Sequence, residues 1–340
     1  PGTDKTRSGR TVLESLVGNG VRRDAVLLCA PTGRAAKRLS EATGYPAYTI
    51  HRAFGLREDS GGDGGSGVRD LDLVIVDEVS MLDMWLGAQL LAHISPETRL
   101  ILVGDAAQLP SVGPGNVLAE IIRSGAVPVA QLKTVFRQAS GSSIAVNAQL
   151  IDSRETELVF DDNFVMIPAK DQQEAMYLLC ALYKRAAESV GPENVQILTP
   201  VRKDGHQCGV NSLNTSIQSM VQDAPGLGYH HYGQYYCVGD PVIQNKNADG
   251  VYNGEIGVVT KVEPDKLHIR FAGYEQDLVY DDKKIGLLDL AYALTVHKSQ
   301  GSEYSVVIIP VLKEHAFMLT RNLIYPAITP GKSKVFLVGH

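Results

Sequence analysis

The sequence predicts an α/β protein with two domains built on parallel sheets and a smaller β-rich module within the second. Three observations indicate this fold: short apolar runs that end in polar residues, helical stretches between those runs, and one segment made of short strands and turns. Short continuous apolar runs are typical of buried parallel strands, and alternating strands and helices favour an open sheet. A length of 340 residues suits about two domains.

Four apolar runs are expected to be strands of the parallel sheets. They are AVLLCA (25–30), LDLVIVDE (71–78), RLILVGD (99–105) and NVQILTP (194–200). The stretch GRAAKRLSEATG (33–44) has a helical pattern, and Gly44 is a suitable stop because glycine readily adopts the left-handed conformation that ends many helices. The stretch DSGGDGGSG (59–67) is too rich in glycine for a packed element, so we expect a loop or hairpin tip near residues 57–70.

The segment from Tyr232 to Gly286 has a different sequence pattern. It contains short strands separated by turns and no helical pattern, which is typical of a small β-barrel. The stretches DLAYALTVHKSQG and SVVIIPV then return to the α/β style, so the simplest organisation is a β module inserted into the second domain. We expect a first domain at 1–145, a β insertion at 232–285, and a second domain made of 146–231 and 286–340.

Composition and cysteine usage narrow the class of protein. Hydrophobic residues make up 44% and charged residues 21% of the chain, as in ordinary globular proteins. No apolar run approaches the ~20 residues that span a bilayer, and the first ten residues lack the apolar segment of a secretory signal. We therefore expect a cytoplasmic protein without membrane contact, whose widely spaced cysteines are reduced thiols and not metal ligands. These are Cys29, Cys180, Cys208 and Cys237.

Charge is unevenly distributed along the chain. The net charge is −6, yet residues 1–57 hold ten Lys and Arg against four Asp and Glu. A local positive face on an acidic body can still neutralise the phosphates of a nucleic acid. A solvated helix face is the alternative explanation for part of this excess.

The first residues, PGTDKT, resemble part of a phosphate-binding loop. In such loops backbone amides surround the phosphates, a lysine reaches the β and γ phosphates, and a hydroxyl binds Mg²⁺. Gly2, Thr3, Lys5 and Thr6 fit these positions. Asp4 stands where the pattern has glycine, and its carboxylate would repel phosphate oxygens. Taken alone, this hexapeptide is better explained by a chance turn.

Two adjacent acids follow the apolar strand in LVIVDEVSMLD (73–83). They would lie at the carboxyl edge of a parallel sheet, where ligands of open α/β sheets bind. Asp77 is expected to hold Mg²⁺ through water, and Glu78 to orient or deprotonate an attacking water. A strand can end in two acids by chance, but Lys5 and Thr6 upstream favour a nucleotide site.

A third apolar strand leads into LILVGDAAQLPSVGPG (100–115). Its Gln108 carries a neutral amide that can contact a γ-phosphate without adding charge. A solvent-exposed glutamine at a sheet edge is the alternative, and Gln108 is persuasive only together with the other motifs.

These motifs occur in one order with several others along the chain. The whole series resembles the RecD-like branch of superfamily-one DNA helicases, which includes the alpha subunit of exodeoxyribonuclease V. The resemblance covers essentially the entire chain. The further segments are APTGRAAKRLSEATG, TIHRAFG, VFRQA, LTPVRK, GDPVIQNKN, YNGEIGVV, LAYALTVHKSQGSEY and RNLIYPAITPGKSKVFLVG.

The resemblance implies a fold and an activity. The fold would be two RecA-like P-loop NTPase lobes, with an SH3-like β-barrel as the insertion of the second lobe. The activity would be ATP-dependent DNA unwinding, with ATP and Mg²⁺ between the lobes, in DNA repair and recombination. The expected partners are single-stranded DNA along which the protein moves 5′ to 3′, duplex junctions, and subunits of a helicase–nuclease complex.

The resemblance also assigns roles to single residues. Lys5, Thr6, Asp77, Glu78 and Gln108 match the nucleotide-site positions already described. Arg137 matches an arginine that reaches the phosphates from across the cleft, and Glu303 an acid near the nucleotide sugar. The positions that match DNA contacts are Thr32, Gly33, Arg34, His51 and Phe54 in the first lobe, and Thr295, His297, Lys298 and Ser299 in the second.

The residue types suit binding to DNA of any sequence. Hydroxyls, backbone amides and cations bind phosphates without reading bases, and an aromatic ring such as that of Phe54 can stack on any base. Each assignment has an alternative, because Phe54 could belong to the core and His51 could be a structural histidine.

Two departures from the family pattern bear on activity, and a missing strand is a separate problem. Asp4 replaces a loop glycine, and Pro330 stands where the last motif has an arginine. That arginine supplies positive charge to the γ-phosphate, a role that can be worth ~10³–10⁵ in rate. Lys332, two positions on, lacks the planar guanidinium fork. The strand that leads into the phosphate loop is also missing from this sequence, which predicts a gap in the first sheet.

The sequence therefore predicts an ATP-dependent DNA helicase motor whose turnover is impaired by Asp4 and Pro330. The rival is a non-hydrolysing module that binds single-stranded DNA or serves assembly while keeping the helicase fold. Four retained residues count against this rival: Asp77, Glu78, Gln108 and Arg137. A nuclease role is disfavoured because the sequence shows no separate acidic metal cluster.

Overall fold

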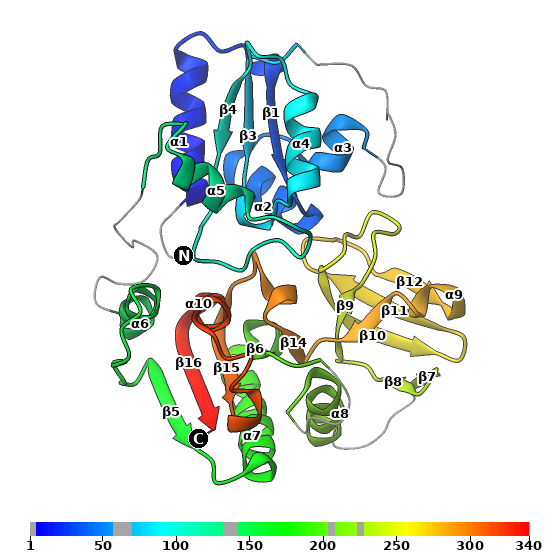
Figure 1. Cartoon of the computed structure of the whole chain (residues 1–340). Coiled ribbons are helices and arrows are strands. Elements are labelled where there is room, and N and C mark those ends of the chain that lie inside the picture. Colours follow the sequence, from blue (N-terminus) through cyan, green and yellow to red (C-terminus); the bar gives the residue numbers. More distant parts are fainter. Residues whose placement is uncertain (1–4, 57–69, 132–141, 203–207, 223–227, 340) are drawn as a thin grey trace. The chain divides into compact units, whose positions relative to one another are not determined.

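The structure is a computed structural model, which describes residues 5–56, 70–131, 142–202, 208–222 and 228–339, except for the side chains of residues 5–9. The chain divides into two compact units, residues 1–137 and 138–340. The first unit contains a parallel sheet with the strand order β2-β1-β3-β4 (Figure 1). Its strands are β1 (Val26–Ala30), β2 (Ala47–Thr49), β3 (Leu73–Val76) and β4 (Arg99–Leu102).

Helices cover both faces of the first sheet. Along each strand, successive side chains point to opposite faces, so Val74 packs on one side and Leu73 on the other. The cluster around Leu73 includes side chains of α1 and α2, and the cluster around Val74 includes side chains of α3, α4 and α5. The helices are α1 (Lys5–Gly18), α2 (Gly33–Thr43), α3 (Ile50–Phe54), α4 (Met84–Ala92) and α5 (Val117–Ser124).

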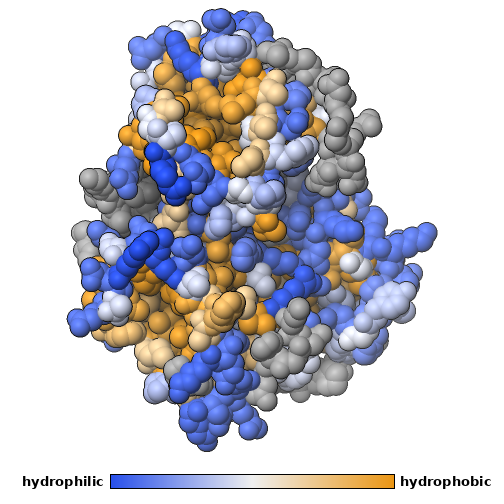
Figure 2. All heavy atoms as spheres, in the orientation of Figure 1, coloured by the Kyte–Doolittle hydropathy of each residue, from blue (hydrophilic) through white to orange (hydrophobic). Residues whose placement is uncertain are grey.

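The expected gap in the first sheet is not found. The four strands pair continuously, and β4 lies at one edge of the sheet. Each strand satisfies the backbone groups of its neighbour, so the sheet is continuous from β2 to β4. Apolar side chains gather at the surface in the region where Figure 1 draws β3 and β4 (Figure 2). Residues 100–102 of β4 are partly exposed, whereas every residue of β3 is buried.

A second parallel sheet forms the framework of the other unit. Its strand order is β14-β6-β15-β16-β5. The strands are β5 (Phe164–Pro168), β6 (Val195–Thr199), β14 (Ala293–Thr295), β15 (Tyr304–Val311) and β16 (Gly331–Gly339). The helices are α6 (Ser143–Asp152), α7 (Gln172–Val190), α8 (Val210–Val221) and α10 (Arg321–Ile328).

The four predicted strands and the predicted helix are confirmed as β1, β3, β4, β6 and α2. Gly44 ends α2 with a φ of 73° and donates its N–H to the Ser40 carbonyl, as its sequence position predicts. The predicted domain border after residue 145 falls inside α6. This helix belongs to the second unit because it packs against α10, where the Arg321 guanidinium donates to the Asp152 carbonyl at 3.0 Å.

The β-rich segment forms an antiparallel sheet with the order β12-β11-β10-β9-β13. The strands are β9 (Pro241–Gln244), β10 (Ile256–Glu263), β11 (Lys266–Phe271), β12 (Leu278–Asp281) and β13 (Leu288–Leu290). A two-stranded ribbon, β7 (Tyr229–His231) and β8 (Gln234–Tyr236), precedes it, and the single-turn helix α9 (Asp282–Ile285) lies within it. The sequence therefore predicted the strands, but it missed α9, and both ends of the module extend beyond 232–285.

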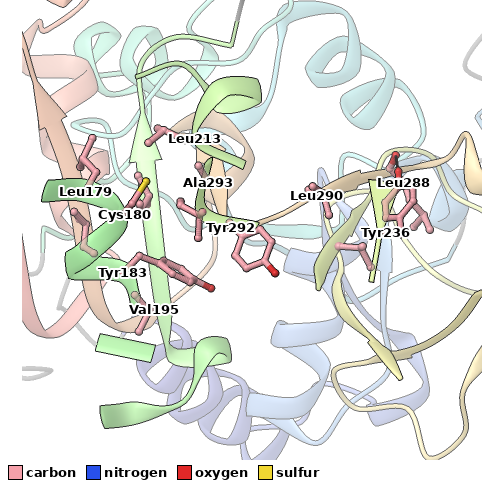
Figure 3. Close-up of a cluster of buried hydrophobic side chains, with 14 of the residues drawn as sticks. Leu179, Cys180, Tyr183, Val195, Leu213, Tyr236, Leu288, Leu290, Tyr292 and Ala293 are labelled. Carbon is pink, nitrogen blue, oxygen red and sulfur yellow. Dashed lines mark hydrogen bonds between the residues drawn. The ribbon is translucent and has the colours of Figure 1, made fainter. Parts of the chain in front are cut away.

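One continuous core joins the antiparallel sheet to the second parallel sheet. It includes Tyr183, Val195 and Ala293 beside Tyr236 and Leu290 (Figure 3). A polar network lies within the same region. The fully buried Asp240 accepts hydrogen bonds from the Tyr292 hydroxyl at 2.7 Å and from the Cys237 amide at 2.7 Å. These bonds compensate for burial, which raises the pKa of Asp240.

Burial also decides the state of the cysteines. All four are free and buried. Burial raises the pKa of Cys29 and of Cys208 to about 12, which keeps both thiols protonated and unreactive. The four cysteines are therefore part of the packed interior of the two units. In the part of the chain that is described, no helix is both long and apolar enough to span a membrane.

Candidate functional site

The carboxyl edge of the first sheet carries the predicted acid pair. Asp77 follows β3 directly and is 9% exposed. Its backbone N–H donates to the Cys29 carbonyl at 3.0 Å, and its Oδ1 accepts the N–H of Glu78 at 2.8 Å. Backbone hydrogen bonds to a carboxylate restrict its position. Asp77 is therefore held in a fixed place at the end of a buried strand.

Glu78 has an unusual backbone conformation. Its φ of 52° and ψ of 41° lie in the left-handed region, where a non-glycine residue is uncommon. The next residue returns to the sheet, because the Val79 N–H donates to the Val103 carbonyl beyond β4 at 3.0 Å. Backbone strain of this kind clusters at functional sites. The turn leaves the Glu78 side chain partly exposed at the sheet edge.

Gly104 fixes the neighbouring loop against this turn. A Cβ placed on Gly104 would lie 2.7 Å from Leu118 Cδ2, 3.2 Å from the Ser80 nitrogen and 3.3 Å from the Val79 nitrogen. Only glycine permits so close an approach without displacement. The loops after β3 and β4 therefore pack directly on each other.

Gln108 lies in the loop that follows β4. Its N–H donates to the Asp105 carbonyl at 3.1 Å, and the Asp105 carboxylate accepts the Ala107 N–H at 3.1 Å. The Gln108 side chain is half-exposed. Because β3 and β4 are adjacent parallel strands, Asp77, Glu78 and Gln108 all follow the same edge of the sheet.

This edge is chemically suited to a magnesium nucleotide. Mg²⁺ prefers oxygen ligands and is commonly held by one or two protein oxygens together with phosphates and waters. A carboxylate such as that of Asp77 meets this requirement. Among the described residues, no group of three or more His, Cys, Asp and Glu side chains could hold a metal ion. A single carboxylate suits an ion that takes its other ligands from a phosphate group and water.

Part of the predicted nucleotide site lies outside the described residues. This applies to Gly2, Thr3, Asp4 and Arg137. Lys5 and Thr6 form the beginning of α1, but their side chains also lie outside the description.

Three predicted DNA positions lie where β1 leads into α2. The Thr32 hydroxyl accepts the Ala35 N–H at 3.3 Å and caps the helix. Gly33 is buried in the first turn, and Arg34 is half-exposed. Capping the helix is a sufficient structural reason for a threonine at position 32. The half-exposed Arg34 lies at the same sheet edge as the acid pair.

The two aromatic candidates of the first unit differ in exposure. Phe54 is 1% exposed and packs in the core cluster around Val74. A ring buried in this way is not available to stack on a base, so the structure supports the core alternative for Phe54. His51 is half-exposed and is stacked with Trp85, with ring centroids 6.4 Å apart and ring planes 29° apart.

Trp85 is a candidate residue that none of the sequence motifs indicated. It is the only tryptophan of the chain, and its side chain is 42% exposed. An exposed tryptophan is informative because the residue is usually largely buried. A signal was present in the sequence, because Trp85 is its single tryptophan and lies two residues after Asp83, whose carboxylate caps α4 by accepting the Leu86 N–H at 2.7 Å.

The carboxyl edge of the second sheet carries an ion-pair cluster. Lys298 Nζ lies 2.7 Å from Asn245 Oδ1 and 3.3 Å from Asp289 Oδ2. The Arg202 guanidinium donates to the same Asp289 oxygen at 3.1 Å. Burial lowers the pKa of Lys298, and the nearby Asp289 opposes that shift. The predicted contact Lys298 thus belongs to a group of two cations around one carboxylate.

The remaining predicted positions of this edge surround Lys298. Thr295 ends β14, and its hydroxyl accepts the Lys298 N–H at 3.4 Å. His297 is exposed, whereas Ser299 is buried and donates its hydroxyl proton to the Val296 carbonyl at 2.8 Å. Thr295 and Ser299 therefore shape the turn, and His297 and Lys298 are the side chains that a ligand could reach.

Glu303 forms an ion pair with Lys332. The distance from Lys332 Nζ to Glu303 Oε2 is 2.7 Å. Pro330 is buried beside this pair, and its carbonyl accepts the Tyr304 N–H at 2.9 Å. The ammonium of Lys332 is thus directed to the acid of the motif GSEY.

Two family models match this chain. One is described as an AAA domain and matches residues 1–164, and the other is a UvrD-like helicase C-terminal domain that matches residues 290–338. The chain is 36% identical over 342 residues to the ATP-dependent RecD2 DNA helicase of Deinococcus radiodurans. It is 31% identical over 384 residues to the RecBCD enzyme subunit RecD of Mycolicibacterium smegmatis. All of this chain is covered in both comparisons, together with 46% and 67% of those relatives.

Solved structures show the same fold. A structure titled for DNA unwinding at forked dsDNA by two coordinating Pif1 helicases has a TM-score of 0.59 and 17% identity. The Pif1 helicase from Bacteroides in complex with ADP-AlF3 and ssDNA has a TM-score of 0.58 and 17% identity. Each covers 97% of this chain, and this chain covers 85% and 86% of them. The likeness shows that this chain shares the α/β fold of these structures.

Proposed function

The chain belongs to the RecD family of DNA helicases, and from this premise we propose that it is the motor part of an ATP-dependent DNA helicase that moves along single-stranded DNA. The observation that carries the proposal is the fixed acid pair Asp77–Glu78 beside the Gln108 loop at one sheet edge. The chain spans about half of its Deinococcus relative, so the proposal concerns the motor and not a whole protein.

In the proposed reaction, each residue at this edge has one task. Asp77 would hold a nucleotide-bound Mg²⁺, together with Thr6. Glu78 would orient the attacking water and accept its proton, since a partly exposed carboxylate at the strand end can act as a general base. Gln108 would contact the γ-phosphate with a neutral amide. The ion supplies positive charge to the phosphates when it is bound.

The proposed second ligand is single-stranded DNA. Arg34 and His51 in the first unit, with His297 and Lys298 in the second, offer cations and ring nitrogens that bind phosphates without reading sequence. Family resemblance adds movement from 5′ to 3′, action at duplex junctions and membership of a helicase–nuclease complex. The name of the Mycolicibacterium relative, a RecBCD subunit, supports the last of these.

We propose that turnover is reduced in this chain by Asp4 and Pro330. By the family pattern, Asp4 would place a carboxylate in the phosphate loop. Pro330 stands where that pattern has an arginine, and Lys332, two positions on, forms an ion pair with Glu303. A missing arginine at such a position can lower a phosphoryl-transfer rate by ~10³–10⁵.

A steady-state ATPase assay with and without single-stranded DNA tests this proposal. We expect slow turnover in the unaltered chain, and DNA-stimulated turnover after Asp4→Gly combined with Pro330→Arg. Asp4→Gly alone isolates the phosphate loop. Ordinary helicase rates in the unaltered chain would contradict the impairment. Failure of the double variant to recover any turnover, while its fold and its DNA binding are intact, would show that these two residues are not the cause.

A further inference from the structure

We propose that Trp85 and His51 form a platform on which a base of single-stranded DNA stacks, a contact that rests on the proposed function and specifies how the first unit holds its strand. The platform is not made by Phe54, the aromatic that the sequence suggests, because that ring is 1% exposed. Trp85 is 42% exposed and lies beside the half-exposed His51. A base has an aromatic face, and a flat, partly exposed ring pair is the surface that it matches.

The position of the platform follows from the topology. His51 is the second residue of α3, which begins directly after β2 ends at Thr49. Trp85 is the second residue of α4, which follows β3 and the acid pair. Both helices therefore begin at the carboxyl edge of the sheet and pack against each other. The platform lies at the edge that also carries Arg34, so a strand along this edge passes both.

Trp85 is not one of the residues through which α4 packs in the hydrophobic core. Leu86 and Leu90 are buried in the cluster that contains Phe54, and they anchor the helix. Trp85 lies next to this stripe and keeps 42% of its surface exposed. Burying the remainder against a ligand base would remove further apolar surface from water. The fold therefore stays anchored through the leucines if the indole is replaced.

Charge favours a nucleic acid as the occupant. Residues 30–56 carry the cations Arg34, Lys37, Arg38 and Arg52 against the single acid Glu41. The Arg52 guanidinium lies over the Tyr48 ring, 5.4 Å from its centroid, which gives a second exposed aromatic beside a cation. Aromatic rings interleaved with cations match the alternating bases and phosphates of a single strand. A protein partner with an apolar surface would not require this positive charge.

The platform can be observed directly, because Trp85 is the only tryptophan of the chain. Titration with an unlabelled oligothymidylate should quench the intrinsic fluorescence to a plateau, because a stacked base quenches an indole. An oligomer of the same length and charge that consists of abasic sites is the matched control. It retains the phosphates but has no base, so it should bind more weakly and leave the fluorescence unchanged.

Substitutions separate stacking from folding. Trp85→Ala should weaken the binding of a labelled oligothymidylate, followed by fluorescence anisotropy, by about tenfold, and Trp85→Phe should retain most of the affinity because it keeps an aromatic face. Trp85→Leu keeps apolar volume without a π face and should resemble Trp85→Ala. His51→Leu should weaken binding in the same direction.

Two results would overturn the inference in distinguishable ways. If the labelled oligomer binds while the indole is not quenched, or if Trp85→Leu binds as well as the unaltered chain, the platform is wrong but the proposed function stands. If the labelled oligomer does not bind at all, the proposed function fails and the platform fails with it.

Discussion

The carboxyl edges of the two parallel sheets both carry predicted site residues, but they hold them by different forces. In the first unit, backbone hydrogen bonds fix Asp77, and a left-handed turn directs Glu78. In the second unit, partly exposed ion pairs join Lys298 and Arg202 to Asp289. Backbone bonds fix geometry largely independently of salt, whereas such ion pairs are screened by salt and exchange readily. The first edge suits a chemical step, and the second suits contacts that are made and broken.

The largest effect is expected at the fixed edge. Glu78→Gln removes the proposed base and keeps the shape of the side chain, so DNA-stimulated ATP turnover should fall by about 10²–10⁴-fold. The measurement is best made in the Asp4→Gly, Pro330→Arg background, where turnover is expected to be high enough to follow. Affinity for single-stranded DNA without nucleotide should not change. Undiminished turnover would remove Glu78 from the mechanism.

The next effect concerns the packing that supports this edge. Gly104→Ala would place a Cβ 2.7 Å from Leu118 Cδ2 and 3.2 Å from the Ser80 nitrogen, so the loops after β3 and β4 must separate. We expect the free energy of unfolding in urea to fall by about 1–3 kcal/mol. Gly18→Ala is the matched control, because its Cβ would meet nothing within 4 Å. Equal stability of the two variants would show that the loops are not tightly packed.

A smaller effect is expected when a change of pH alters the charge of Lys298 and with it the affinity for single-stranded DNA. Burial lowers the pKa of Lys298 below the ordinary lysine value of 10.5, so this lysine loses its proton at a lower pH than an exposed lysine does. Its positive charge is lost as the pH rises through this lowered pKa. Affinity for single-stranded DNA should therefore decline over the alkaline range by up to about fivefold, which corresponds to ~1 kcal/mol.

Lys298→Arg is the control for this pH profile, because a guanidinium stays protonated throughout the range. The variant should show a flatter decline than the unaltered chain. Identical profiles for the two proteins would exclude Lys298 as the titrating contact.

The smallest effect, on the free energy of unfolding, is expected at the partly exposed ion pair between Lys332 and Glu303 at the starts of β16 and β15. Lys332→Met breaks the ion pair with Glu303 but keeps most of the aliphatic chain of the lysine. The pair is partly solvated, so the free energy of unfolding should change by less than about 1 kcal/mol. A larger loss in a urea titration would mean that this ion pair contributes more than a solvated pair does.

The sequence predicted well what depends on local pattern. Continuous apolar runs identified the buried strands β1, β3, β4 and β6, and the carboxyl ends of β3 and β4 identified the edge that carries the acid pair. The stop of α2 at Gly44 was predictable because the left-handed residue at a helix end has a clear preference for glycine.

Features that depend on tertiary packing were not predictable in this way. Phe54 and Trp85 are both aromatic residues near the same edge, and only the packing of α3 against α4 buries one and exposes the other. The ion pair of Lys332 with Glu303 arises because β15 and β16 are neighbours in the sheet, although their first residues, Tyr304 and Gly331, are 27 positions apart in the chain. Pairings of that kind are set by sheet order and not by spacing.

In a motor, binding of nucleotide must change the affinity for single-stranded DNA, and we expect this coupling in the present chain. The most direct test measures the affinity for a labelled oligothymidylate by anisotropy, with and without a non-hydrolysable ATP analogue and Mg²⁺, in the chain that carries Asp4→Gly. We expect the dissociation constant with the analogue to differ from the one without it. The same dissociation constant at every nucleotide concentration would contradict it and would identify the chain as a DNA-binding module that keeps the helicase fold.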